Sequence, residues 1–174
     1  CKVTPPIPTD PAHFAELEED LTQMGCVGFL HQGWHLKHAP MLEELTSRHL
    51  PAGYSKTLRA QPGKWTLAVW RQVYDFERGG EGLATRKEDY TKGKFLTKPH
   101  PNDGYRIDDC IDERERRLLA FLVPILHPKK PAVVPITIAS TILSAKAGDR
   151  EVCWSRVVKD IVLDLIKGLG NSRP

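Results

Sequence analysis

The sequence predicts a mainly α-helical protein, a compact domain of five or six helices with at most one short β-hairpin. Apolar residues recur at spacings of three and four in several segments, which is the period of a helix with one buried face. Strand-like and helical segments do not alternate, so the pattern of a parallel sheet with crossover helices is missing. The chain also shows no internal repeat.

Residues 1–9 contain three prolines and are expected to form an extended arm. Asp10 then offers an N-cap acceptor, and Pro11 follows at the first helical position. These two residues predict a helix start, and Gly25 predicts the end of the same helix. Its inward-facing residues are Phe14, Leu17, Leu21 and Met24.

Three short elements are expected next. A second helix is predicted over residues 41–50, and a third helix begins at Thr66 and runs until Gly79. Between them, Gln61-Pro62-Gly63 is typical of a turn joining two short extended pieces, 56–60 and 64–67.

The C-terminal part predicts three further helices. Helical spacing returns at Asp108 and is expected to end irregularly around Pro124 and Pro128. A helix of small residues follows and ends at Gly148, and a last helix is predicted over residues 153–167. The C-terminal core is expected to form around Ile138, Ile142, Val157 and Ile161.

The chain divides at a long polar segment that has no sustained period. We therefore expect an arm over residues 1–9, an N-terminal helical lobe over 10–80, a basic polar linker over 81–106 and a C-terminal three-helix lobe over 107–170.

Composition excludes several protein classes. Hydrophobic residues make up 40% and charged residues 27%, which is typical of a globular protein rather than a disordered one. The richest apolar run, LLAFLVPIL at 118–126, is too short to span a bilayer, and no signal peptide is visible, so we expect no membrane partner. A net charge of +3 permits contact with nucleic acid without establishing it.

The four cysteines are scattered, without a CxxC pair, which favours reduced thiols in an intracellular protein of the nucleus or cytoplasm. Cys26 and Cys153 are expected to be buried. Because the chain begins with Cys1 rather than methionine, we expect a fragment or a processed product.

The stretch CVGFLHQGWHLKH carries three histidines, His31, His35 and His38, at spacings that suit a metal site on a helix. However, glycines interrupt the stretch, and Gln32 and Gly33 stand where an HExxH motif would place its glutamate and next residue. A structural loop is the favoured interpretation. A metal-dependent enzyme centred on these histidines, with Asp108 or Asp112, is the alternative, and no cofactor is expected.

The acidic block DDCIDERERR, 108–117, resembles paired carboxylates for two-metal chemistry. Acidic residues at a helix start followed by arginines are equally what the helix dipole and pairing at i,i+4 favour, and we adopt this second interpretation. The chain has no GxSxG elbow and no phosphate-binding glycine loop, so no catalytic residue is predicted.

The segment TRKEDYTKGKFLTKPHPNDGYR, 85–106, is the best candidate for a binding surface, because flexible cations and aromatic rings together suit single-stranded nucleic acid. The same composition also describes a linker whose aromatic rings dock on its own domain. The predicted nucleic-acid-binding residues are Arg86, Lys87, Tyr90, Lys92, Lys94, Phe95, Lys98 and Arg106.

The strings QMGCVGFL, PMLEEL and GKWTLAVWRQVYDFERGGEG, with the C-terminal half from LLAFLVPIL onward, resemble a plant retroelement- or transposon-associated helical domain of the plant-mobile-domain type. The resemblance covers about residues 17–170 and rests on hydrophobic patterns, not on catalytic motifs. It implies an intracellular plant protein of mobile-element origin that works by interaction rather than by catalysis.

The predicted function is therefore a non-catalytic interaction domain that binds protein partners, single-stranded nucleic acid, or both. Two alternatives remain open: the metal-dependent enzyme described above, and an oligomerising, capsid-like scaffold domain.

Overall fold

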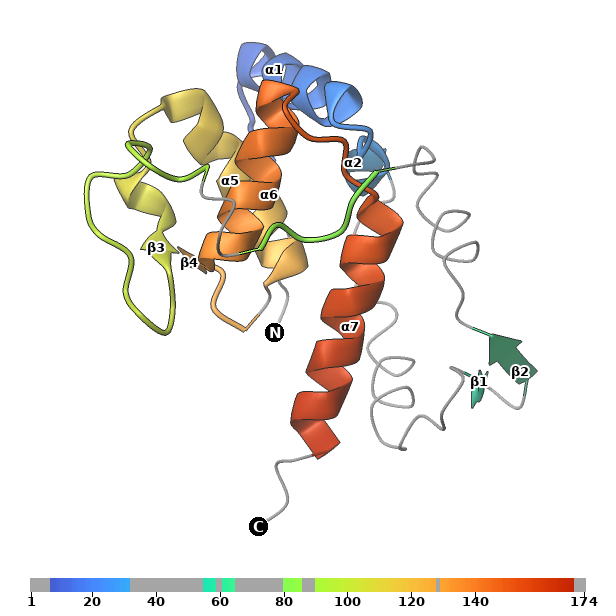
Figure 1. Cartoon of the computed structure of the whole chain (residues 1–174). Helices are drawn as coiled ribbons and strands as arrows, with labels where there is room; N and C mark the ends of the chain where they lie inside the picture. Colours follow the sequence, from blue (N-terminus) through green and yellow to red (C-terminus); the bar gives the residue numbers. More distant parts are fainter. Residues whose placement is uncertain are drawn as a thin grey trace.

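The computed structural model is mainly helical, which confirms the predicted fold class (Figure 1). The residues that it describes are 7–31, 55–58, 61–64, 80–85, 90–127 and 129–170. Its helices are α1 (Pro11–Gln23), α2 (Gly28–His31), α5 (Glu113–Leu126), α6 (Ile136–Ala147) and α7 (Trp154–Gly170). The helices predicted over 41–50 and after Thr66 lie outside the described residues.

Helix α1 begins and ends where the sequence predicts. The Asp10 carboxylate accepts a hydrogen bond from the Ala12 N–H at 2.9 Å, and Pro11 occupies the first turn. Leu17 and Leu21 are buried, and Gly25 follows the helix with a φ of 74° that glycine adopts without strain. Local capping chemistry and an apolar stripe are thus enough to define this element.

Helix α5 begins later than the predicted start at Asp108. Residues Ile107–Asp109 form one turn of 3-10 helix, and Asp112 is the N-cap, its Oδ1 accepting from the Glu115 N–H at 2.8 Å. Pro124 lies inside the helix, which continues to Leu126. The predicted irregular end is therefore restricted to the C-cap.

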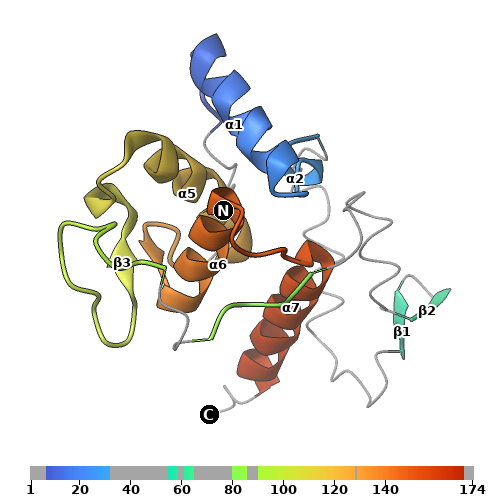
Figure 2. The same ribbon diagram turned by 45° about the horizontal axis from the view of Figure 1, so that its top comes forward.

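Helix α6 is the centre of the core. Every residue from Ile138 to Ala145 is buried, and small side chains such as Ala139 and Ser140 allow neighbouring elements to approach closely. Gly148 ends the helix in the left-handed conformation, as the sequence predicts. Figure 2 shows α6 between α5 and α7.

The first turn of α7 joins the C-terminal helices to the N-terminal ones. Trp154 is buried and donates its Nε1–H to the carbonyl oxygen of Met24 at 2.7 Å. Its ring meets Phe29 edge-on at 6.3 Å between centroids. Described residues on both sides of the expected 81–106 linker consequently contribute to one hydrophobic core.

The members expected in the C-terminal core belong to this single core. Ile138, Ile142 and Val157 are buried, and Ile161 is partly buried against them.

The predicted hairpin exists, but its turn does not lie at Gln61-Pro62-Gly63 as the sequence predicts. Strands β1 (Ser55–Leu58) and β2 (Gln61–Lys64) are antiparallel with Leu58 opposite Gln61, so the connection falls between these two residues. Pro62 and Gly63 lie inside β2 instead of forming the turn. Proline is tolerated there because a two-stranded sheet consists of edge strands only.

A second pairing was not predicted. Strand β3 (Tyr105–Arg106) pairs antiparallel with β4 (Val133–Val134), two residues on each side. Gly104, just before β3, has a φ of 92°, and a Cβ there would lie 2.1 Å from the carbonyl oxygen of Val134. Only glycine fits this close approach of two backbones. Among the helices that the structure describes, none is long and apolar enough to cross a membrane.

Candidate functional site

The predicted binding surface lies on residues 90–111, here called the 90–111 segment, which covers the start of α5 and leads through β3 (Figure 1). Two isolated antiparallel bridges, Phe95 with Cys110 and His100 with Gly104, fold it back on itself. The part of the expected linker that the structure describes is thus ordered by backbone hydrogen bonds to itself and to its surroundings.

Of the three aromatic rings of the segment, two are buried and one is exposed. Phe95 and Tyr105 are buried and stacked, with ring centroids 4.1 Å apart and an interplanar angle of 12°. The Tyr105 hydroxyl shares a buried hydrogen bond of 3.0 Å with Thr91 Oγ1. Phe95, predicted to stack on bases, belongs to the core, as the docking-linker interpretation expects. Tyr90 alone of these three rings is exposed.

Lys94 holds the segment against α5. Its Nζ lies 2.8 Å from Glu115 Oε1, and the hydrogen bond to this buried carboxylate raises the pKa of Lys94. The lysine is thereby engaged within the domain, which makes it a weaker candidate for contact with phosphate than its sequence context indicates.

The remaining predicted cations divide into two groups. Lys92, Lys98 and Arg106 are exposed, and within the described part of the chain they form no ion pair. Arg86 and Lys87 lie outside the described residues.

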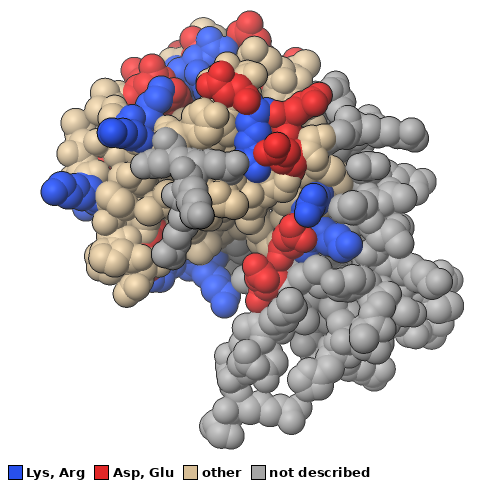
Figure 3. Space-filling model, in the orientation of Figure 1, with Lys and Arg blue, Asp and Glu red and all other residues tan. Residues whose placement is uncertain are grey.

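Acidic side chains accompany these cations. Asp103 forms an ion pair with Lys130, which lowers the Asp103 pKa, and Asp109 accepts a hydrogen bond from Thr97 at 2.7 Å. Asp108 is exposed. Figure 3 likewise shows acidic and basic side chains interleaved over the face that carries α1. The surface is mixed in sign rather than uniformly basic.

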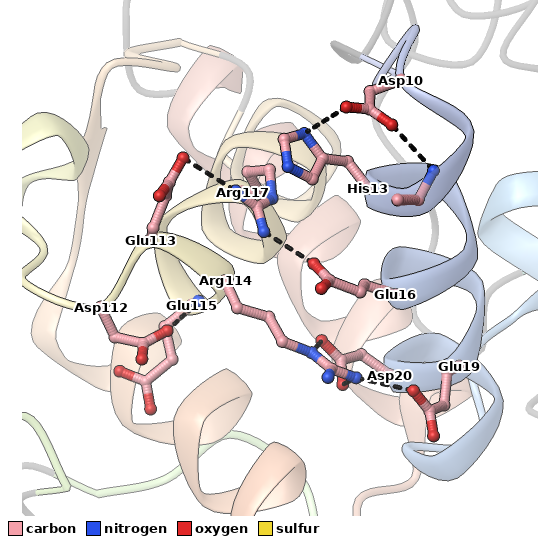
Figure 4. Close-up of polar contacts among 11 residues, drawn as sticks. Asp10, His13, Glu16, Glu19, Asp20, Asp112, Glu113, Arg114, Glu115 and Arg117 are labelled. Atoms are coloured by element: carbon pink, nitrogen blue, oxygen red, sulfur yellow. Dashed lines mark hydrogen bonds and ion pairs between the residues drawn. The ribbon is translucent and has the colours of Figure 1, made fainter.

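The charged residues of the acidic block cap α5 and form ion pairs along it and with α1, as the helix interpretation predicts (Figure 4). Arg114 binds Asp20 on α1 through two hydrogen bonds, of 2.7 and 3.0 Å. Arg117 pairs with Glu16 of α1 at 2.7 Å and with Glu113 one turn earlier at 3.0 Å. The pairs with Asp20 and Glu16 attach α5 to α1.

The histidine hypothesis falls mostly outside the described residues. His31 ends α2, but its side chain is not described, and His35 and His38 lie outside the described residues. Within the described ranges, no group of three potential metal ligands comes together.

The cysteines predicted to be buried, Cys26 and Cys153, are buried, and so is Cys110. Burial raises the pKa of the Cys26 thiol well above its usual range and that of Cys110 to about 11. These two thiols are therefore protonated at neutral pH and are poor nucleophiles.

Comparison of the chain with models of protein families, with curated proteins and with solved structures gave no match. The geometry adds two residues that the sequence did not single out, the exposed Leu96 and Ile111. In the sequence, their exposure could have been inferred only from their position next to Phe95 and Cys110, because the neighbours of a buried residue face the other way when side chains alternate.

Proposed function

We propose that the chain is an interaction domain rather than an enzyme, and that it binds single-stranded nucleic acid through the exposed cations of the 90–111 segment. The observation that carries the proposal is the placement of Lys92, Lys98 and Arg106, exposed and without an ion pair among the described residues. A plant mobile-element origin is part of the same proposal and rests on the sequence pattern alone.

The fold presents these cations from a backbone that is held in place. The segment is anchored by Phe95, Tyr105 and the Lys94–Glu115 pair, so its backbone is held while the long cationic side chains reach outward. Such cations follow a phosphate backbone, and the exposed ring of Tyr90 offers a stacking surface for a base. Three cations are few, so the affinity is expected to be modest.

The test measures binding of a short labelled single strand by fluorescence anisotropy across a salt series. With three phosphate contacts, the logarithm of the binding constant should fall against the logarithm of salt concentration with a slope of about −2. Each of Lys92→Gln, Lys98→Gln and Arg106→Gln should make the slope less steep by about 0.7.

Arg156→Gln is the matched control, because Arg156 is an exposed cation on α7, away from the 90–111 segment. This variant should retain the slope of the unmodified chain. Binding that does not depend on salt, or an equal effect of all four substitutions, would remove the proposed interface.

A further inference from the structure

Leu96 and Ile111 are the two most exposed large apolar side chains in the part of the chain that the structure describes. Their exposed fractions are 74% and 57%. A single exposed leucine is ordinary, but two such residues flanking one bridged pair, Phe95 with Cys110, invite explanation.

The backbone explains why both side chains face outward. The 94–96 and 109–111 stretches run antiparallel, with Leu96 N–H donating to the Asp109 carbonyl at 2.9 Å and Ile111 N–H to the Lys94 carbonyl at 3.0 Å. Phe95 and Cys110 lie opposite each other between these bonds and are buried. Residues on either side of a bridged pair point to the opposite side of the backbone from it, in agreement with the exposure of Leu96 and Ile111. These neighbours, here called the outer face, are Lys94, Leu96, Asp109 and Ile111.

The outer face has an internal symmetry. In the antiparallel register, Lys94 lies opposite Ile111, and Leu96 lies opposite Asp109. The two apolar residues therefore occupy one diagonal, and the two opposite charges occupy the other. A half-turn about the apolar diagonal exchanges the position of the lysine with that of the aspartate.

We propose that the outer face is a self-association surface, on which a second copy of this chain docks about a two-fold axis along the Leu96–Ile111 diagonal. This arrangement stacks Leu96 on Leu96 and Ile111 on Ile111, and it places each Lys94 against Asp109 of the other copy. Charge complementarity selects this occupant, because a uniformly acidic or basic partner would meet one like charge on the face.

The contact is small, so the dimer is weak. Two apolar side chains and one ion pair on each copy lie well below the roughly 800 Å² per partner that a stable interface buries. A dissociation constant of about 100 μM or weaker is expected. Lys94 keeps its bond to Glu115 in the dimer, because an ammonium group has three donors.

The first experiment is sedimentation equilibrium of the full chain from about 10 μM to about 1 mM, the range that brackets this constant. The average mass should rise toward that of a dimer. Leu96→Ser should abolish the rise, whereas Ile7→Ser, which removes an exposed aliphatic residue elsewhere, should retain it. A constant mass for the unmodified chain, or equal effects of the two substitutions, overturns the proposal.

A charge exchange tests the two-fold axis. Lys94→Glu and Asp109→Lys each place like charges across the axis, so either variant alone should be monomeric. Their equimolar mixture restores two opposite-charge contacts and should associate. Circular dichroism checks that each variant is folded, and the Leu96→Ser comparison stands if one is not. Association of the unmodified chain without recovery in a mixture of folded variants overturns the axis.

The test also separates self-association from the proposed nucleic-acid binding. The mass should rise in the absence of any oligonucleotide. Association that occurs only when a single strand is added would show bridging by nucleic acid, and it would overturn direct contact through the outer face.

Discussion

Two neighbouring residues of α5 attach it to different parts of the molecule. Arg114 binds Asp20 and so joins α5 to α1, while Glu115 binds Lys94 and joins α5 to the 90–111 segment. Both contacts place an ion pair beside buried apolar residues, and both include a carboxylate that is largely withdrawn from water. They differ in how completely that carboxylate is satisfied.

At the α1 contact, the Asp20 side chain is 5% exposed, and both of its oxygens accept hydrogen bonds from Arg114. At the other contact, the Glu115 side chain is 11% exposed, and only Oε1 is bonded; Oε2 is buried without a partner among the described residues. The planar guanidinium matches a carboxylate in two places, whereas an ammonium group binds as a point. We therefore expect the Arg114–Asp20 contact to contribute more to stability than the Lys94–Glu115 contact.

The largest effect is expected for Arg114→Met. Methionine retains the apolar packing of the arginine stem but leaves the Asp20 carboxylate buried and unpaired. We expect the free energy of unfolding to fall by about 3–5 kcal/mol, measured by urea denaturation near neutral pH.

The control for that prediction is the double variant Arg114→Met with Asp20→Leu. Replacing both partners by apolar residues removes the buried charge, so most of the lost stability should return. A double variant as unstable as the single one would show that packing of the stem, and not the charge on Asp20, dominates the contact.

A smaller effect is expected for Lys94→Met. Glu115 loses its one bonded partner, but it already tolerates an unpaired oxygen, and the Lys94 side chain is 43% exposed. The free energy of unfolding should fall by about 1–3 kcal/mol. A loss equal to that of Arg114→Met under the same conditions would contradict the ranking of the two contacts.

The stability contributed by Lys94 should also depend on pH in the alkaline range. The pKa of Lys94 is raised above its ordinary 10.5, chiefly by the hydrogen bond to Glu115. Its contribution to stability is therefore complete below that ordinary value and is lost as the pH rises through the raised pKa. The difference in unfolding free energy between the unmodified chain and Lys94→Met should stay constant up to about pH 10 and shrink as the pH rises above the ordinary value of 10.5.

The helices were the part of the fold that local sequence could define. Asp10 with Pro11 predicts the start of α1, and Gly148 predicts the end of α6, because each signal acts through its nearest neighbours. The hairpin shows the limit of such signals. Pro62-Gly63 is typical of a turn, yet the register with Thr57 and Lys56 places both residues inside β2. Which residues connect the strands depends on how the two strands pair, and the local turn signal does not specify that pairing.

The binding segment was predictable in composition but not in geometry. Its cations and rings are plain in the sequence, but which ones face outward depends on contacts between distant residues. Phe95 is buried because it bridges to Cys110 and stacks on Tyr105, fifteen and ten positions further along the chain. Lys94 is engaged because Glu115 lies beneath it. Local sequence does not specify these long-range contacts, so it does not show which side chains of the segment face outward.

The smallest effect is expected for Arg117→Met, the same substitution one turn along α5 from Arg114. Arg114 bonds Glu19 as well as Asp20. Arg117 likewise bonds two carboxylates, but its partners Glu16 and Glu113 are 38% and 67% exposed. Water can solvate both when the guanidinium is removed, so the free energy of unfolding should fall by about 1 kcal/mol or less.

Because the two variants share their chemistry, their helix and the number of carboxylates each arginine bonds, urea denaturation of both tests mainly the burial of the carboxylate left behind. A loss for Arg117→Met as large as that for Arg114→Met would mean that the count of ion pairs, and not burial, sets the strength of the α1–α5 contact. The expected gap between them follows from Asp20, whose side chain is 5% exposed, whereas the other three carboxylates are 38% exposed or more.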